Sequence, residues 1–112
     1  MPLAAKRCRP CEGGTPRLTA GETRDLHREI PAWTLGETRL RRHFTFADFR
    51  AAMGFVDRMA EVAEAEGHHP DFSVHYREVD VEVWTHAIGG LSENDFILAA
   101  KIDQLPVELK GK

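Results

Sequence analysis

The chain has 112 residues, 42% of them hydrophobic and 29% charged, a composition typical of one globular domain with its own core. Its formal net charge of −3 gives no general electrostatic reason to expect nucleic acid or an anionic membrane as a partner. No apolar run approaches the roughly 18 to 20 residues that span a bilayer, and the start lacks the apolar core of a signal peptide. We therefore expect a cytoplasmic protein.

Residues 1–19 are rich in proline, glycine and threonine and show no periodicity. They predict a flexible segment ahead of one folded domain over residues 20–112. Cys8 and Cys11 in this segment form a Cys-x-x-Cys pair, which can be half of a zinc site or a redox pair. Neither further zinc ligands nor a strand-to-helix context lies nearby, so reduced thiols are favoured over a metal or redox role.

A short helix is predicted next. Thr19 and Glu22 have the spacing of a capping box, which opens a helix, and Pro31 prevents the helix from continuing beyond about Glu29. His27 lies on this helix without a partner at helical spacing. We interpret it as a solvated or packing histidine.

A β-hairpin is predicted from residues 32–35 and 38–44. Leu40, Arg42 and Phe44 alternate onto one face of its second strand. Because Arg42 is charged, we expect its alkyl part to pack on that face while its guanidinium reaches water at an edge.

A long amphipathic helix is predicted from a second capping box, Thr45 to Asp48, to about Glu66. Gly67 suits the left-handed conformation that ends helices, and Pro70 keeps the helix from resuming, so the chain must turn at the histidine pair between them. Apolar positions repeat at intervals of three and four. We interpret them as one stripe facing the core: Phe49, Ala52, Met53, Val56, Met59, Ala60 and Ala63.

A second pair of strands is predicted over residues 72–76 and 78–85. His75, on the first of them, is interpreted as a strand-face residue without a role. The second strand alternates strictly, so one face belongs to the core and the other is polar. The core face carries Val79, Val81 and Val83, and the opposite face carries Asp80, Glu82, Trp84 and His86.

A last helix is predicted to begin at Ser92 and to run through Leu105, where Pro106 ends it. The predicted order is helix, strand, strand, helix, strand, strand, helix. We therefore predict an α+β domain in which three helices pack on one face of a four-stranded antiparallel sheet.

A motif of fixed residue types and spacings runs from Glu64 to Asp95. It resembles the signature of the pterin-4a-carbinolamine dehydratases, with weaker similarity from about Gly21 to the end of the chain. The resemblance implies the same α+β fold and homodimers or homotetramers. The motif consists of Glu64, His68, His69, Pro70, Asp71, Tyr76, Val79, Val81, Val83, Thr85, His86, Gly90, Leu91, Ser92 and Asp95. Similar residues outside it are Trp33, Phe44, Thr45, Phe46, Phe49, Gly54, Phe55 and Val56.

From this resemblance, His68, His69 and His86 match the family's catalytic histidines, with Asp95 as a supporting position. Dehydration of a carbinolamine takes a proton from a nitrogen and gives one to the departing hydroxyl, and imidazole can do both near neutral pH without a metal or redox cofactor. We expect His68 and His86 to transfer protons and His69 to place the hydroxyl, although spacing does not decide acid from base. Asp95 can fix a histidine tautomer or hold imidazolium charge, or it can simply cap the last helix, and these interpretations stay open.

The remaining expected site residues contact the substrate. Glu64 can accept hydrogen bonds from the amino and ring N–H groups of a pterin, and Phe72 and Trp84 can flank the flat ring. Pro70 and Thr85 complete this set. Phe72 and Trp84 also differ from the residues of some animal members, which leaves the side chain of the natural pterin open.

The leading functional hypothesis is a lyase that converts a 4a-hydroxytetrahydropterin into quinonoid dihydropterin and water, linked to an aromatic amino-acid hydroxylase. One alternative is a binding protein for a pterin or for molybdopterin without catalysis. Another is a dimerization cofactor of a transcription factor, which requires an exposed apolar stripe on the last helix. We expect no direct contact with nucleic acid or with a membrane.

Overall fold

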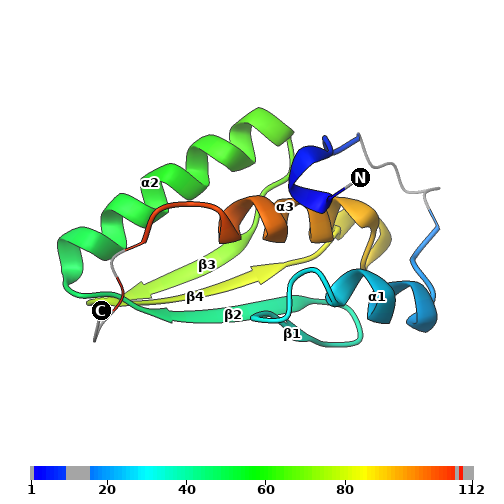
Figure 1. Cartoon of the computed structure of the whole chain (residues 1–112), viewed down its shortest axis with the longest axis horizontal. Helices are drawn as coiled ribbons and strands as arrows, with labels where there is room; N and C mark the ends of the chain where they lie inside the picture. Colours follow the sequence, from blue (N-terminus) through cyan, green and yellow to red (C-terminus); the bar gives the residue numbers. More distant parts are fainter. Residues whose placement is uncertain (1, 10–15, 108, 110–112) are drawn as a thin grey trace.

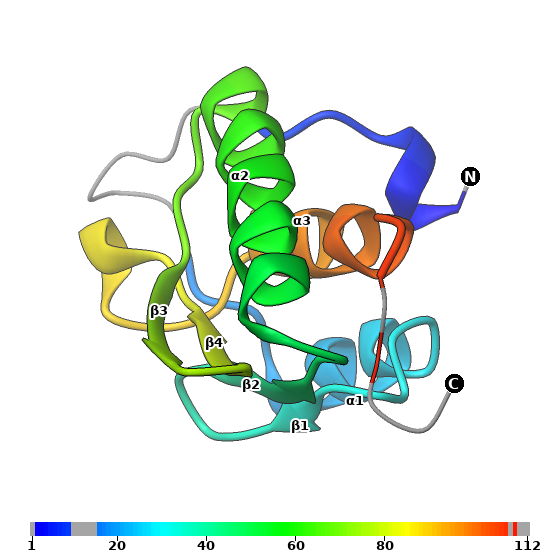
Figure 2. The ribbon, with the colours of Figure 1, turned by 90° about the vertical axis from the view of Figure 1, so that its left-hand side faces the viewer.

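A four-stranded antiparallel sheet underlies two crossing helices in the computed structural model, which describes residues 2–9, 16–107 and 109 (Figure 1). Helices α2 and α3 lie over the same face of the sheet, and α1 contacts the edge strand β1 (Figure 2). The strand order is β1-β2-β4-β3. The elements are η1 (Leu3–Ala5), α1 (Ala20–His27), β1 (Thr34–Leu35), β2 (Leu40–Thr45), α2 (Phe49–Glu66), β3 (Asp71–His75), β4 (Glu78–Val83), η2 (His86–Ile88) and α3 (Glu93–Asp103).

This architecture confirms the predicted α+β class and the order of its helices and strands. The strand ends differ from expectation by one to two residues: β1 is shorter, β3 begins at Asp71, and β4 ends at Val83. The three valines of β4 are buried, as the alternation predicted. No helix among the described residues combines the length and apolar character that crossing a bilayer requires.

The first helix begins as predicted and ends slightly early. Thr19 and Glu22 form the reciprocal capping box, and the helix stops at His27 rather than near Glu29. The ring of His27 bonds the carbonyl of Trp33 through Nε2 (2.6 Å), so it is a packing histidine.

The predicted start of the long helix was wrong. Thr45 does not cap α2, because it still pairs with Glu78 in the β2–β4 ladder and its backbone is extended. The cap is Asp48, whose carboxylate accepts from the amide of Ala51 (2.8 Å). At the other end Gly67 adopts the left-handed conformation (φ 65°), as predicted.

The predicted apolar stripe of α2 was also partly wrong. Phe49 and Met53 are 52% and 37% exposed, whereas Phe55, which the stripe left out, is fully buried. Apolar residues occupy more than one face of α2, so spacing alone admits two stripes. The helix is oriented by the packing of Phe55 on Phe44 and Phe46, with ring centroids 4.7 and 5.1 Å apart. The buried residues are Ala52, Phe55, Met59 and Ala63.

We expect Phe55→Ala to lower the free energy of unfolding by about 3–5 kcal/mol, because it deletes a buried ring from the junction of helix and sheet. Urea unfolding measures the change. Phe49→Ala removes the same ring from an exposed position of the same helix and is the matched control, with an expected change below about 1 kcal/mol. Equal losses in the two variants would contradict this orientation of α2.

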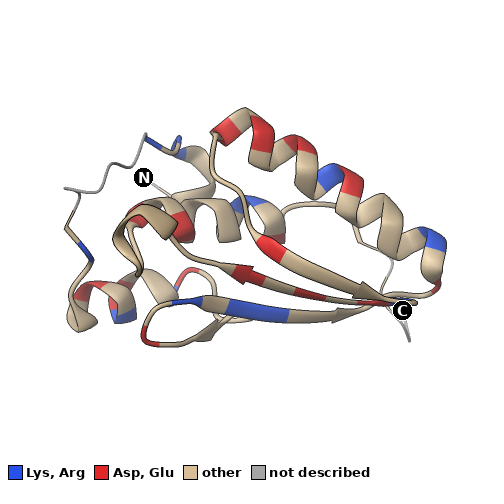
Figure 3. Ribbon diagram, turned by 180° about the vertical axis from the view of Figure 1, so that it is seen from behind, with Lys and Arg blue, Asp and Glu red and all other residues tan. Residues whose placement is uncertain are grey.

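The face of the sheet opposite α2 and α3 is charged. Basic residues gather on β2 and acidic residues on the neighbouring β4 (Figure 3). Arg41 pairs with Glu82, and His43 bonds Asp80 through Nδ1 (2.6 Å). Arg42 projects to the helix side instead, where its guanidinium lies 4.3 Å from the centre of the Phe44 ring.

Candidate active site

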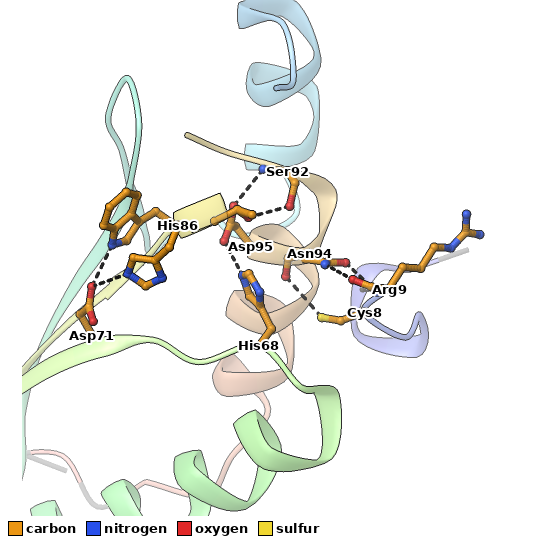
Figure 4. A network of polar contacts seen from close by, with 10 residues as sticks. Cys8, Arg9, His68, Asp71, His86, Ser92, Asn94 and Asp95 are labelled. Atoms are coloured by element: carbon orange, nitrogen blue, oxygen red, sulfur yellow. Dashed lines mark hydrogen bonds and ion pairs between the residues drawn. The ribbon is translucent and has the colours of Figure 1, made fainter. Parts of the chain in front are cut away.

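A buried pair, His68 and Asp95, joins the end of α2 to the start of α3. Nε2 of His68 lies 2.6 Å from Oδ1 of Asp95 (Figure 4). The two side chains are 11% and 0% exposed. Gly67 ends α2 and turns the chain so that His68 leaves the helix next to the first turn of α3. Its Nδ1 has no hydrogen-bond partner among the described residues.

Asp95 serves two purposes at once. Its Oδ2 accepts hydrogen bonds from the backbone amide of Ser92 (2.9 Å) and from the hydroxyl of Thr85 (2.8 Å). The bond from the Ser92 amide is part of the capping box of α3. Oδ1 of Asp95 is left for His68. The capping and histidine-holding interpretations of Asp95 are therefore compatible, because each uses a different oxygen.

The other two predicted histidines also bond carboxylates through Nε2. His69 bonds Glu64, which lies near the end of α2, and both side chains are exposed. His86, at the start of η2, lies 3.3 Å from Oδ2 of Asp71. Each of the three imidazoles thus has one nitrogen held by a carboxylate, the arrangement that sets which ring nitrogen carries the proton in the neutral form.

Asp71 is a candidate site residue that the sequence-based set of predicted site residues omitted. Its carboxylate accepts from the indole N–H of Trp84 (2.8 Å) and contacts His86. These hydrogen bonds hold the pKa of Asp71 below its usual value, and the bond from Trp84 has the largest effect. Asp71 pairs with Glu82 across the β3–β4 ladder, so its side chain lies on the same face of the sheet as those of Trp84 and His86. Strand alternation, combined with the correct register, would have predicted this position.

Asp71 should make stability depend on acid pH. A carboxylate whose folded pKa is lowered adds stability that is present above its unfolded pKa, about 3.9, and is lost as pH falls through the folded value. We expect Asp71→Asn to destabilise the protein at pH 6 and to destabilise it less at pH 3, below the unfolded pKa. Urea unfolding at both pH values measures this, and a loss that is equal at both would contradict the assignment.

The three histidines line one pocket of about 220 Å³, together with Arg9, Gly67, Thr85 and Ala87. General ligand pockets run from about 300 to 1,000 Å³, so this pocket is smaller than that range. A depression of about 410 Å³ on the sheet includes Phe72 but none of the three histidines, so size alone does not identify the site.

The structure gathers part of the predicted site into this pocket. Asp95 bonds His68, and Glu64 bonds His69, so each is linked to the pocket by a histidine that lines it. Trp84 lies beside His86, with ring centroids 4.1 Å apart, and Arg39 covers the indole at 4.5 Å from its centre. Four predicted substrate contacts are not among the lining residues: Glu64, Pro70, Phe72 and Trp84.

In the described part of the chain, no group of three or more side chains is arranged to hold a metal ion. Cys8 lies within this part and its thiol donates to the carbonyl of Asn94 (3.6 Å). Cys11 lies outside the described residues, so the role of the cysteine pair stays a prediction.

Comparison with protein families gives a match over residues 16–105 to the model described as pterin 4 alpha carbinolamine dehydratase. A protein of Methylococcus capsulatus is 48% identical over 108 residues, covering 95% of each chain. One of Nitrosospira multiformis is 50% identical over 104 residues, covering 92% of this chain and 91% of the relative. Both relatives are named provisionally as pterin-4-alpha-carbinolamine dehydratases.

Two solved structures are similar. The transcriptional coactivator/pterin dehydratase of Brucella melitensis superposes with a TM-score of 0.74 and 36% identity, over 79% of this chain and 96% of that one. A pterin dehydratase-like protein identified as a RuBisCO assembly factor superposes with a TM-score of 0.54 and 22% identity, over 63% and 82% of the chains. At that identity the second similarity concerns the fold alone.

Proposed function

Because the chain belongs to the pterin 4 alpha carbinolamine dehydratase family, we propose that it is a lyase that removes water from a 4a-hydroxytetrahydropterin. The observation that carries this proposal is the convergence of His68, His69 and His86 on one pocket. They come from two separate places in the fold, the residues that follow α2 and the start of η2. A shared fold alone does not require three histidine side chains to line one pocket.

The reaction needs one proton removed and one delivered. A base takes the proton from the ring nitrogen beside the carbinol carbon, and the electron pair of that N–H bond forms a C=N bond. The C–O bond breaks, and an acid protonates the departing hydroxyl to give water. Product and water balance the substrate. The base ends protonated and the acid ends deprotonated, and one proton exchanged through solvent restores both.

In this proposal His68 is the base. The Asp95 carboxylate holds the proton of its neutral ring on Nε2, so Nδ1 is the nitrogen that can accept one. His86 protonates the leaving hydroxyl, and His69 places that hydroxyl. Glu64 accepts from the amino and ring N–H groups of the pterin.

Turnover of a synthetic 4a-hydroxytetrahydropterin, followed by ultraviolet absorbance, tests the proposal. We expect decay to quinonoid dihydropterin well above the spontaneous rate, in proportion to enzyme concentration. Decay at the spontaneous rate would count against the lyase. Binding of the same pterin without turnover would instead favour a non-catalytic pterin- or molybdopterin-binding protein.

The dimerization-cofactor alternative lacks the feature it required. Helix α3 exposes no apolar stripe, because its apolar residues from Phe96 to Ile102 are buried. The exposed apolar residues of the long helix are Phe49 and Met53 on α2. The word coactivator is part of the name of the Brucella relative and describes that protein. For this chain the lyase is the better-supported proposal.

The cellular setting is proposed on chemical grounds. A quinonoid dihydropterin is useful to the cell when a reductase restores it for a pterin-dependent hydroxylase. We therefore propose that the protein works with an aromatic amino-acid hydroxylase. From the family resemblance we propose a homodimer or homotetramer, and we place it in the cytoplasm. Size-exclusion chromatography with light scattering measures the oligomer, and a monomer at micromolar concentration would contradict that part.

A further inference from the structure

Residues 3–9 lie across the two helices that bring the buried histidine–aspartate pair together. Leu3 is 1% exposed, and its amide donates to the carboxylate of Glu29 (3.1 Å). Lys6 pairs with Glu93, the first residue of α3 (2.7 Å). The family match begins only at residue 16, so it assigns these residues no role.

Cys8 and Arg9 make the contacts nearest the pocket. The Cys8 amide donates to Oε1 of Glu66 (2.8 Å), the last residue of α2, and the Cys8 thiol donates to the carbonyl of Asn94 in α3. The Arg9 amide donates to Oδ1 of Asn94 (2.9 Å), and the Asn94 side chain donates back to the Arg9 carbonyl. Figure 4 shows this exchange beside the His68–Asp95 bond, with the Arg9 guanidinium directed away from His68.

Glu66 is the anchor of these contacts on α2. Its side chain is 6% exposed and pairs with Arg7 (3.1 Å) and Lys101 (3.6 Å). Burial by itself would raise the pKa of Glu66, but the Cys8 amide and the two cations lower it below its usual value. The carboxylate is therefore charged, and hydrogen bonds to a charged group are about twice as strong as neutral ones.

The thiol of Cys8 acts here as a hydrogen-bond donor. Burial, and after it the nearby Glu66 carboxylate, raise the pKa of Cys8 to about 12. The thiol is therefore protonated at neutral pH, as the contact with the Asn94 carbonyl requires.

We infer that residues 3–9 form a clasp that holds the end of α2 against the start of α3 and so fixes His68 on Asp95. Glu66 lies two residues before His68, and Asn94 directly precedes Asp95. The clasp therefore ties the backbone on both sides of the 2.6 Å bond between the pair. Arg9 lines the pocket, whereas the other members of the clasp are not among its lining residues and are positioning residues. Their effect on turnover rests on the proposed lyase function.

The test compares variants of Glu66 in the full chain. Glu66→Ala removes the anchor, whereas Glu66→Gln keeps an oxygen that can accept from the Cys8 amide. Glu61→Ala changes an exposed glutamate of the same helix and is the matched control. Exchange of the His68 Nε2 proton with water, measured by nitrogen-15 NMR, reports the His68–Asp95 bond without reference to turnover.

We expect Glu66→Ala to speed this exchange about tenfold or more and to lower kcat about tenfold with a smaller change in KM, since small misplacements of catalytic groups slow chemistry strongly. Glu66→Gln should recover most of both losses, and Glu61→Ala should match the parent. Asn94→Ala, which cuts the side-chain bonds to Arg9 from the α3 side, should act like Glu66→Ala.

Unchanged exchange in folded Glu66→Ala and Asn94→Ala would overturn the clasp, whatever their activity. A parent protein that does not turn over the pterin would remove the lyase proposal, while the exchange measurement would still decide on the clasp. Should Glu66→Ala fail to fold, Asn94→Ala carries the same comparison.

Discussion

Alanine at both His68 and His86 is expected to bring decay of the 4a-hydroxytetrahydropterin close to its spontaneous rate. General acid or base catalysis by a positioned group contributes about 10²–10⁴-fold, and these two histidines are the proposed base and acid. Each single variant should lose activity on that scale. The double variant should lose less than the product, because the two groups act in one step.

The matched control for this experiment is His75→Ala. His75 is an exposed histidine of β3 and is not among the residues that line the pocket, so its loss should leave turnover unchanged. His68→Gln separates proton transfer from folding, because a glutamine amide can still donate to Asp95 but does not titrate. A double variant as active as the parent would remove the catalytic assignment.

The sequence was informative wherever local rules are strict. The alternation of β4 and the glycine after α2 each leave one local solution, and both were confirmed. The spacing around His68 and His69 also placed them at a helix end with a forced turn. These features depend on neighbours within a few residues, which a pattern can encode.

The errors arose where long-range packing decides. The cap at Asp48 follows from the pairing of Thr45 with β4, and the orientation of α2 follows from rings on β2 that meet Phe55. The link from Asp71 to His86 likewise depends on strand register. The contacts of Cys8 and Arg9 with Glu66 and Asn94 join positions more than 50 residues apart in the chain, so no local periodicity predicts them.

Asp95 should show separate effects on stability and on turnover. Asp95→Ala leaves the Ser92 amide and the Thr85 hydroxyl without their acceptor in a buried position and breaks the pair with His68. Each buried donor that loses its acceptor costs about 1–3 kcal/mol, so the losses at Ser92, Thr85 and His68 together cost roughly 3–5 kcal/mol. We expect a destabilisation of that size by urea unfolding, with lost activity as a secondary consequence.

Asp95→Asn is the more informative change. An asparagine of the same shape can accept from Ser92 and Thr85 through its oxygen while its amide group faces Nε2 of His68. Since an amide N–H donates, Nε2 must then accept, and the proton of the neutral ring moves to Nδ1, the proposed basic nitrogen.

Asp95→Asn should therefore keep much of the stability that Asp95→Ala loses and still lower kcat by about 10²–10⁴-fold. Urea unfolding and pterin turnover on the same samples measure the two effects, and nitrogen-15 shifts of His68 identify the tautomer. Full activity in a stable Asp95→Asn variant would reduce Asp95 to a helix cap. Stability retained with activity lost would favour a carboxylate that holds the His68 tautomer or its imidazolium charge over a helix cap, and the nitrogen-15 shifts of His68 separate these two roles.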